Sequence, residues 1–381
     1  MNIPFAPPYI TEDEIKAVTE VLKSGWLSLG HKTLEFEKAF GEYVGSRYAV
    51  ATDSCTGALF LSLKVLGIKE GDEVITTPFT FAATANVIVH CGAKPVFVDI
   101  DKKTYNIDAD KLAEGITDRT RAIIVVHYGG QPADMKKAMK IASEHNLQVI
   151  EDAAHAAGAE YETGRKVGSL GNLTCFSFYP TKPITTGEGG MITLDDGALC
   201  ERLRILRLHG MSRDAWKRYL QEGNWYYEIT EAGYKFNPSD IASAIGGEQL
   251  RKLDWMNERR KTISEYYDER LQGLRIVRPY LDPKIKSSYH LYPIRVISYD
   301  RSRFITQMAQ KGIATSVHFI PLHLMPFYQR EYGYKRGDFP IAERVFEDIV
   351  SLPIYPQLTE KQLDYIIKNV KEILSERHVK Q

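Results

Sequence analysis

Lys182 has the most unusual local setting among the residues of this sequence that could do chemistry. It lies between Pro180 and Pro183, after an apolar run and before the turn GEGG (187–190). A loop lysine is usually a solvated surface charge, because lysine is seldom buried. The two prolines, however, fix a non-helical backbone, and the glycines shape the turn more than a plain exposed loop requires. Lys182 is therefore a candidate functional amine.

Asp152 is the second candidate, because it ends the mostly apolar run LQVIED (147–152). In open α/β sheets, ligands bind at the carboxyl ends of the strands, so a polar residue there can face a ligand. Aspartate is also a preferred helix cap. The sequence leaves both interpretations open: a cap for the next segment, or a buried charge with a cationic partner.

The segment DSCTGALFLSL (53–63) is the third candidate, because small residues open an apolar helix there. The backbone N–H groups of Thr56, Gly57 and Ala58, with the Thr56 hydroxyl, would form a phosphate cup at the helix N-terminus. The alternative is an ordinary serine or threonine cap. A cup, a carboxylate and a lysine are the three groups that pyridoxal phosphate requires, to hold its phosphate, its ring nitrogen and its aldehyde. We therefore expect pyridoxal 5′-phosphate as the cofactor.

Seven β-rich runs precede residue 200, and several are apolar throughout. Such runs are typical of strands covered by helices on both faces, so they predict an α/β domain with a mostly parallel seven-stranded sheet. We expect crossover helices at 57–67, 82–90 and 132–146, and a first helix that begins with a capping box at Thr11 and Glu14. The runs are YAVAT (48–52), DEVITT (72–77), KPVFVDI (94–100), RAIIVVHY (121–128), LQVIED (147–152), LTCFSFY (173–179) and GMITL (190–194).

The sequence changes character near residue 246, so we predict a large domain over 1–245 and a smaller C-terminal α+β domain over 246–381. The smaller domain is expected to contain a long charged helix (248–273), the runs HLYPIRVI (290–297) and TSVHFI (315–320), and a helix near 302–311. The aromatic-rich segment 210–237 has weak periodicity. We interpret it as a long excursion of the kind that is usually functional or at an interface.

The composition narrows the function classes. Lys plus Arg equals Asp plus Glu at 49 each, so the net charge draws the protein neither to nucleic acid nor to an anionic membrane. The four cysteines lie far apart, with no CxxC pair and no histidine at metal spacing, so we expect no metal site. A cytoplasmic protein without a membrane segment is the best fit.

Nearly the whole chain resembles one family, the DegT/DnrJ-type nucleotide-sugar aminotransferases of fold type I. EDAA and FSFYPTK together are the most specific part of this resemblance. The segments that carry it are IPFAPPYITEDEIKAVTEVLKSGWLSLG (3–30), DSCTGAL (53–59), GDEVITTPFTFAATANVI (71–88), EDAAHAAGA (151–159), FSFYPTKPITTGEGGMI (176–192), GYKFNPSDIASAIG (233–246) and TSVHFIPLHLMPFY (315–328).

The resemblance implies a role for each matching residue. Lys182 would bond covalently to the cofactor, Asp152 would contact the ring nitrogen, and His155 would lie beside the ring hydroxyl oxygen. Phe81 would stack on the ring, although a phenylalanine is more often a core residue. The remaining positions would bind the phosphate: Thr56, Gly57 and Ser177 from the same subunit, and Asn237 from the second subunit of a homodimer.

One departure from the family pattern is Pro183, where the family usually has asparagine after the lysine. Proline has no N–H donor, so we expect a local adjustment of the backbone without loss of activity.

The function implied is transamination from glutamate, which becomes 2-oxoglutarate, to a nucleotide-linked keto sugar. The TTGEGG turn resembles the branch that acts on 4-keto sugars, so a UDP- or dTDP-linked 4-keto-6-deoxyhexose is expected, giving a 4-amino sugar for polysaccharide, lipopolysaccharide or glycan synthesis. Candidates for the diphosphate and sugar, each more often a solvated or structural side chain, are His209, Arg213, Lys235, His318 and His323.

Several alternatives remain. The first is a 3-keto sugar aminotransferase of the same family. A related dehydratase class has histidine in place of the lysine, which Lys182 argues against. A non-catalytic protein that binds the cofactor for regulation would be a different class. Other fold type I enzymes, such as lyases and cysteine desulfurases, would share the lysine and the aspartate but not GYKFN or PLHLMPFY.

Overall fold

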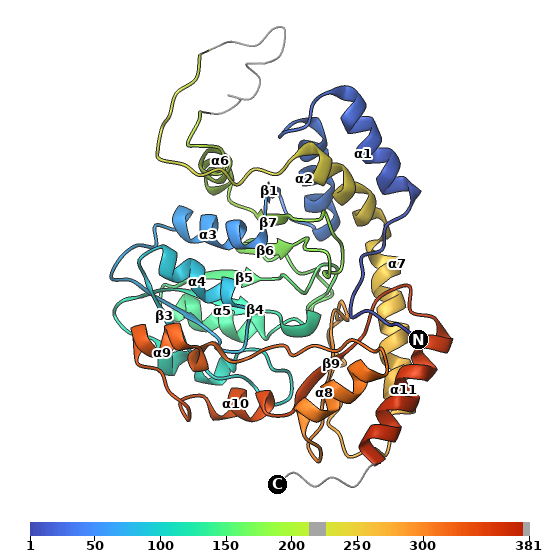
Figure 1. Cartoon of the computed structure of the whole chain (residues 1–381). Coiled ribbons are helices and arrows are strands. Elements are labelled where there is room, and N and C mark those ends of the chain that lie inside the picture. Colours follow the sequence, from blue (N-terminus) through green and yellow to red (C-terminus); the bar gives the residue numbers. More distant parts are fainter. Residues whose placement is uncertain (213–225, 376–381) are drawn as a thin grey trace.

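A seven-stranded sheet forms the centre of the computed structural model, which describes residues 1–212 and 226–375 (Figure 1). The strand order is β1-β7-β6-β5-β4-β2-β3. The strands are β1 (Tyr48–Thr52), β2 (Glu73–Thr76), β3 (Lys94–Phe97), β4 (Thr120–Val126), β5 (Gln148–Asp152), β6 (Leu173–Ser177) and β7 (Gly190–Leu194). Each strand overlaps one of the seven predicted runs.

Five of these strands, β2 to β6, pair in parallel, whereas β7 is antiparallel to both of its neighbours, β6 and β1. The prediction of a mostly parallel, helix-covered α/β sheet is therefore confirmed. Strands β5, β6 and β7 are almost completely buried, which explains why their sequences are apolar without alternation.

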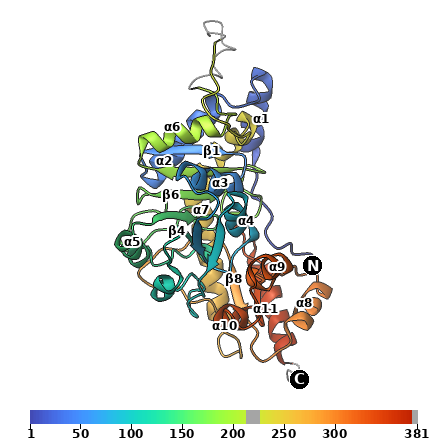
Figure 2. The same ribbon diagram turned by 90° about the vertical axis from the view of Figure 1, so that its left-hand side faces the viewer.

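Two helical layers cover the sheet, as Figure 2 shows from the side. On one face, α2, α5 and α7 contribute to a core with Phe40, Met135 and Leu253; on the other, α3, α4 and α6 contribute to a core with Leu59, Val87 and Leu203. The helices of this part are α1 (Glu12–Ser24), α2 (His31–Val44), α3 (Cys55–Val65), α4 (Ala82–His90), α5 (Met135–Glu144), α6 (Gly197–Leu206) and α7 (Asp240–Arg270), with short 3₁₀ helices η1 (Ala109–Gly115) and η2 (Tyr128–Gly130).

The strand register brings several chain segments to one edge of the sheet. Thr52 and Ser177, the last residues of β1 and β6, both pair with Gly190, the first residue of β7. Asp152, the last residue of β5, pairs with Cys175 of β6. Because β7 runs backward, the β6–β7 connection that contains Lys182 begins and ends at this carboxyl edge.

The C-terminal part has its own hydrophobic core around a two-stranded antiparallel sheet. Residues of the second half of α7, among them Tyr267, pack there with Tyr292, Phe304 and Ile366. Its elements are β8 (Tyr292–Arg295), α8 (Arg301–Gln310), η4 (Leu322–Leu324), α9 (Pro326–Tyr332), α10 (Pro340–Phe346), β9 (Ile349–Leu352) and α11 (Glu360–Ser375). The predicted boundary at 245/246 falls inside α7, which is 31 residues long and runs through both parts.

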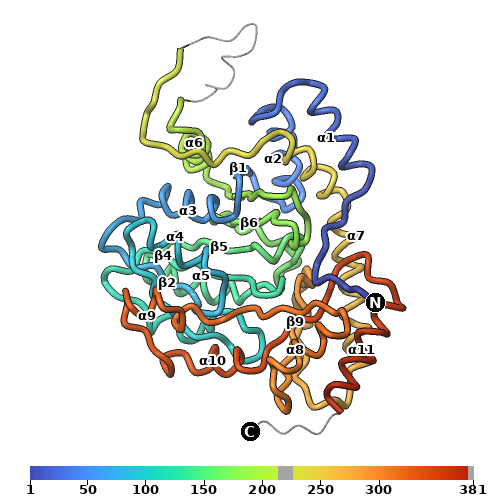
Figure 3. The backbone as a smooth tube through the Cα atoms, in the orientation of Figure 1, coloured from blue at the N-terminus to red at the C-terminus, as the bar shows by residue number. Residues whose placement is uncertain are grey.

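Helices α9 and α10 return to the large sheet. Phe97 and Tyr128 pack with Tyr328 and Phe339 in a further core cluster, and Figure 3 shows the orange and red tube of this segment beside β2 and β4. The run TSVHFI (315–320) forms no strand, but only an isolated bridge from Ser316 to Ser351 of β9. This segment leaves the small sheet early and turns toward the carboxyl edge of the large one.

The four cysteines are free and buried. Burial raises the pKa of the Cys91 and Cys200 thiols to about 11, and it also raises the pKa of the Cys55 and Cys175 thiols. Across residues 1–212 and 226–375, no helix is both long and apolar enough to cross a bilayer, and no group of three or more His, Cys, Asp or Glu side chains could hold a metal ion.

Candidate active site

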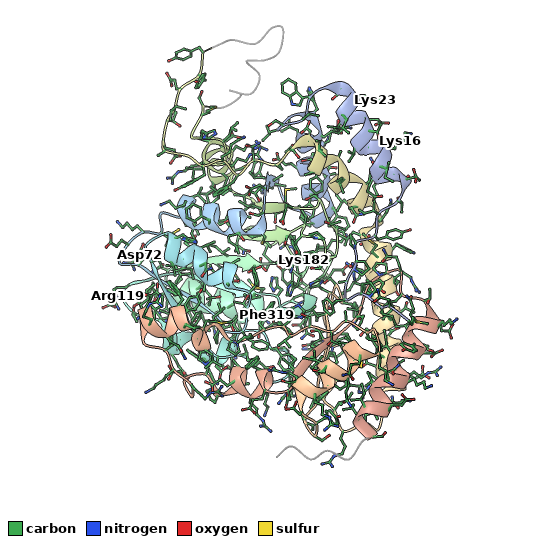
Figure 4. The ribbon with its side chains drawn as sticks, in the orientation of Figure 1. Lys16, Lys23, Asp72, Arg119, Lys182 and Phe319 are labelled. Carbon is green, nitrogen blue, oxygen red and sulfur yellow. The ribbon has the colours of Figure 1, made fainter. Side chains whose placement is uncertain are left out.

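A cavity of about 570 Å³ opens at the carboxyl edge of the large sheet. Its walls come from the ends of β5 and β6, the starts of α3 and α4, the β6–β7 connection and residues 316–319. Figure 4 shows Lys182 and Phe319 in the middle of the molecule, far from the labelled surface residues Lys16 and Arg119. Six of the eight predicted site residues line this cavity: Thr56, Phe81, Asp152, His155, Ser177 and Lys182.

Lys182 lies in a backbone turn held from two sides. Its N–H donates to the Tyr179 carbonyl at 2.9 Å, and the buried guanidinium of Arg260, from α7, donates to the Pro183 carbonyl at 3.1 Å. The Lys182 side chain is half-buried because it faces the cavity while protein surrounds the rest of it. Burial lowers the pKa of its amine to about 8, and the nearby charge of Asp152 partly opposes that change.

Asp152 lines the same cavity and is buried, with an exposed fraction of 6%. Its carboxylate accepts hydrogen bonds from the Thr84 hydroxyl at 2.7 Å and from the Ala154 N–H at 3.2 Å. Burial raises the pKa of Asp152, whereas the Thr84 and Ala154 hydrogen bonds and the charge of Lys182 act in the opposite direction. Between the cap and the buried charge left open by the sequence, the structure supports the buried charge.

His155 is held as a neutral imidazole with a defined tautomer. Its Nδ1 accepts a hydrogen bond from the Gly129 N–H at 3.2 Å, so the ring proton is assigned to Nε2. Burial and the charge of Lys182 move its pKa well below the usual histidine value. The ring is stacked with Phe319, with centroids 5.9 Å apart and an interplanar angle of 16°.

Ser54, not Thr56, caps the N-terminus of α3. The Ser54 hydroxyl accepts the Gly57 N–H at 3.0 Å, and the Ser54 carbonyl accepts the Ala58 N–H at 3.0 Å. Both N–H groups therefore have partners within the chain in this structure, and their place in a phosphate cup stays a prediction. The hydroxyls of Thr56 and Ser177 line the cavity at the same end of the sheet.

Gly57 is required for close packing. A Cβ atom at this position would lie 2.9 Å from Asp53 Oδ1 and 3.4 Å from the ring of Phe236. A side chain at this position would therefore require the Asp53 carboxylate to move.

Phe81 lies at the rim of the cavity and precedes α4 as its N-cap residue. Its exposed fraction of 65% excludes the alternative that it belongs to the core. An exposed phenylalanine ring that faces a polar cavity offers an apolar surface on which a flat ligand can stack.

Asn237 lies outside this cavity, in an adjoining open cleft of about 330 Å³ that shares Glu188 with it. Its side chain accepts a hydrogen bond from Lys235 and donates one to the Pro238 carbonyl at 3.1 Å. A single chain therefore does not bring Asn237 to the residues around Lys182.

The candidates for diphosphate and sugar binding differ in whether they line the cavity. His318 lines the cavity, and its Nδ1 is paired with the Ser351 hydroxyl at 2.9 Å. His323 is completely buried against Glu343 at 2.9 Å, and neither His209 nor Lys235 lines the cavity. Arg213 lies outside the described residues.

The site also contains residues that the sequence did not single out. Thr80, Tyr179, Glu188 and Phe319 line the cavity, and Thr84 lies behind Asp152. Thr80 and Thr84 occur in the segment GDEVITTPFTFAATANVI (71–88), directly after β2 at the ligand-binding edge of the sheet, and this position was the only signal for them.

The lining groups fit pyridoxal phosphate. The volume lies within the roughly 300 to 1,000 Å³ typical of cofactor sites. The cavity offers an amine with a lowered pKa, a buried carboxylate, hydroxyls beside a helix N-terminus and an exposed aromatic ring. These groups match the aldehyde, ring nitrogen, phosphate and ring face of that cofactor, respectively.

Comparison with known proteins agrees with this geometry. The model of the DegT/DnrJ/EryC1/StrS aminotransferase family matches residues 8–371. The spore coat polysaccharide biosynthesis protein SpsC of Bacillus subtilis is 47% identical over 98% of this chain and 97% of its own length. The uncharacterized protein MJ1066 of Methanocaldococcus jannaschii is 53% identical over 98% of both chains.

A solved structure is similar over the same length. Spr1654 of Streptococcus pneumoniae, a candidate sugar aminotransferase, superposes with a TM-score of 0.93 at 36% identity, covering 98% of this chain and all of that one in its PMP form. It has also been solved in a PLP form and an apo form. These three states of one similar protein differ in the cofactor that they carry.

Proposed function

Since the chain belongs to the DegT/DnrJ/EryC1/StrS aminotransferase family, we propose that it transfers the amino group of glutamate to a nucleotide-linked 4-keto-6-deoxy sugar. The coarser predictions are confirmed: the fold is that of a fold type I aminotransferase, and the cofactor is pyridoxal phosphate, as the PLP and PMP forms of Spr1654 indicate. When bound, this cofactor supplies an electron-accepting ring that stabilises negative charge on the carbon from which a proton is removed.

One observation carries the proposal: Lys182 and Asp152 line one cavity, and the charge of each affects the pKa of the other. Asp152 favours the protonated amine, and Lys182 favours the ionised carboxylate. A covalent amine and a partner for the ring nitrogen have to lie in such proximity. Two groups that were 30 residues apart in the sequence thus become one functional unit.

Lys182 would act as nucleophile and then as a proton carrier. Its amine would hold the cofactor covalently through the aldehyde until the amino group of glutamate takes its place. The freed amine would then accept the proton that the donor loses and return it later in the reaction. A pKa of about 8 suits both tasks, since a substantial fraction of the amine is neutral near neutral pH. The second half-reaction runs these steps backward on the keto sugar.

The other residues would bind and orient. Asp152 would hold the ring nitrogen in its protonated form, and Phe81 would stack on the ring. His155 has its proton on Nε2 because Gly129 occupies Nδ1, so it can donate to the ring hydroxyl oxygen. Thr56, Gly57 and Ser177 would hold the phosphate, with Thr56 and Ser177 contributing hydroxyls. Asn237 would reach the same phosphate from the second subunit of a homodimer, which is consistent with its place outside its own cavity.

The choice of a 4-keto sugar rests on the TTGEGG turn (185–190), which contributes Glu188 and Gly189 to the cavity wall. A UDP- or dTDP-linked substrate, giving a 4-amino sugar for a surface polysaccharide or glycan, is in keeping with SpsC being a spore coat polysaccharide biosynthesis protein. His318 is the one predicted sugar or diphosphate ligand that lines the cavity among the described residues. A 3-keto substrate of the same family is the second candidate.

A spectroscopic experiment tests the proposal. The purified protein should absorb visible light from lysine-bound cofactor, lose that band with glutamate and regain it with the correct keto sugar. Lys182→Ala should lose both the band and at least about a thousandfold in turnover, since nucleophile and proton carrier are removed together. Lys371→Ala, at an exposed position on α11, is the matched control and should behave as wild type.

The substrate is tested with a panel of 4-keto and 3-keto nucleotide sugars, followed by mass spectrometry of the products. Incorporation of an amino group at C4 supports the proposal, whereas incorporation only at C3 selects the second candidate. Cofactor binding without turnover on any member, with no bleaching by glutamate, would instead indicate the non-catalytic binding protein.

A further inference from the structure

The Asp152 carboxylate has a specific support on α4. Thr84, with an exposed fraction of 0%, donates its hydroxyl hydrogen bond to Asp152 Oδ2 at 2.7 Å, across 68 residues of sequence. The hydroxyl of Thr80 lies 2.9 Å from that of Thr84, and Thr80 lines the cavity. A continuous line of three side chains therefore connects the cavity wall to the carboxylate.

The direction of these hydrogen bonds follows from the number of protons. A threonine hydroxyl has one proton, and an ionised carboxylate can only accept. Because Thr84 donates to Asp152, Thr84 must accept from Thr80. The line runs from Thr80 to Thr84 to Asp152, and it is compatible with Asp152 in its charged form. A proton on Oδ2 would require both hydroxyls to turn around.

The position of Thr84 on its helix adds a second effect. α4 begins at Ala82 with Phe81 as its N-cap, so Thr84 belongs to the first turn. A carboxylate within hydrogen-bond reach of the first turn of a helix is stabilised in its charged form by the helix dipole. Burial of Asp152 favours the neutral form. The first turn of α4 thus opposes the main force that would remove the charge.

We propose that Thr84 is a positioning residue of the active site, whose hydroxyl keeps the Asp152 carboxylate charged and oriented toward the ring nitrogen of the cofactor. This inference rests on the proposed role of Asp152. In this role the Thr80–Thr84 pair supports the contact between the Asp152 carboxylate and the ring nitrogen, and does not only pack α4 against the sheet.

The test compares two ligands on the same variant. Pyridoxal phosphate and its 1-deaza analogue share the aldehyde and the phosphate, but the analogue has a carbon in place of the ring nitrogen. Equilibrium titration of the cofactor-free protein gives the ratio of the two dissociation constants. Wild type should prefer pyridoxal phosphate, and Thr84→Val should reduce that preference by at least about tenfold, as expected for loss of a hydrogen bond to a charged group.

Two variants serve as controls. Thr84→Ser keeps the hydroxyl and should retain the preference to within about threefold. Thr76→Val makes the same substitution at another fully buried threonine, whose hydroxyl donates to the Ile124 carbonyl at 3.0 Å away from the cavity, and should leave the ratio unchanged. General destabilisation weakens both ligands together, so it does not move the ratio.

Thr80→Val provides a second measurement should Thr84→Val not fold, and it should lower the preference in the same direction by a smaller factor. The inference is overturned if Thr84→Val, or Thr80→Val in its place, weakens both ligands equally or neither. If wild type itself fails to distinguish the two ligands, the role proposed for Asp152 is wrong. If it binds neither, the proposed function itself fails.

Discussion

Burial and neighbouring charge shift the pKa of the Lys182 amine in opposite directions, and burial has the larger effect. Burial removes water from the ammonium group and lowers its pKa from 10.5, while Asp152 and then Cys55 act in the opposite direction. The result of about 8 lies between a permanently charged lysine and a fully neutral amine. The same amine can therefore act as a nucleophile and a base, and can later release a proton, near neutral pH.

This balance predicts how covalent capture of the cofactor depends on pH. Only the neutral amine attacks the aldehyde, so the capture rate in cofactor-free protein should rise with pH and level off above about 8. Stopped-flow absorbance between pH 6 and 10 measures it. A rate that still climbs tenfold per pH unit at pH 9 would show that Lys182 has an ordinary lysine pKa.

Asp152→Asn tests the same balance through a shift in the pH midpoint of the capture rate. Because the charge of Asp152 raises the pKa of Lys182, its removal should move the midpoint of the capture rate below that of wild type. A midpoint that moves upward would contradict the electrostatic contact between the two residues.

At the residue scale, sequence patterns were sufficient where the local chain is distinctive. Prolines, glycines and a strand end marked Lys182 and Asp152, and both line the cavity. Thr84 carries no such mark, since it belongs to an ordinary helix start and its partner is 68 residues away. Contacts that depend on how α4 meets β5 cannot be predicted from either segment alone.

At the scale of elements, the reversal of β7 is what keeps Lys182 at the ligand-binding edge. A parallel β7 would need a crossover that carries the chain to the far edge of the sheet. The sequence predicted the strand at 190–194 but not its direction, because a buried strand looks alike in both orientations. Gly190 is part of the reason for the fit, since a Cβ there would lie 2.6 Å from the backbone of Ser54.

The sequence predicted the capping box at the start of α1, but not the contact of α1 with α7. The capping box of Thr11 and Glu14 is present as expected. Glu14 also accepts hydrogen bonds from Gln249 at 2.8 Å and Lys252 at 3.0 Å, both on α7. Gln249 in turn accepts the Thr185 N–H at 3.3 Å, near Lys182. The cap thus joins the N-terminal helix to the β6–β7 connection, which no local pattern could indicate.

These contacts lower the pKa of Glu14 to about 2, so its stabilising effect depends on pH. A depressed carboxyl pKa contributes stability above the unfolded value of about 4.5, and that contribution disappears as the pH falls toward 2. Glu14→Gln should cost about 2 kcal/mol in unfolding free energy at pH 7. The difference from wild type should shrink between pH 5 and pH 3 in urea unfolding experiments.

Glu20→Gln is the control, since Glu20 is exposed on the same helix. It should unfold as wild type does at every pH. An unchanged free-energy difference between Glu14→Gln and wild type at pH 3 would mean that the charge of Glu14 is not what holds α1 to α7.

At the scale of the whole molecule, the cavity is assembled from parts that are distant in sequence. Residues 316–319 from the C-terminal region close a site whose other walls come from the large sheet.

The proposed dimer makes a specific prediction about mixed subunits. Each of the two variants Lys182→Ala and Asn237→Ala should lower the enzymatic activity of its own homodimer. If Asn237 acts across the interface, a mixed dimer contains one site with both residues intact. Co-refolding the two variants in equal amounts should restore about a quarter of wild-type activity, because half of the dimers are mixed and half of their sites are complete.

Size-exclusion chromatography with light scattering should show a dimer for each variant and for the mixture. Activity of the co-refolded mixture that equals the average of the two variants would place Asn237 and Lys182 in sites of the same chain, or remove Asn237 from the site altogether.

The buried cysteines can serve as natural probes of local opening in the native state. Cys55 lines the cavity, Cys175 lies on β6 and Cys200 on α6, and each thiol has a raised pKa. A thiol reagent can modify Cys175 and Cys200 only when the surrounding helices open, so the labelling rate of these two residues reports opening events in the native state. Mass-resolved labelling would then tell which helical layer loosens first, without any engineered reporter.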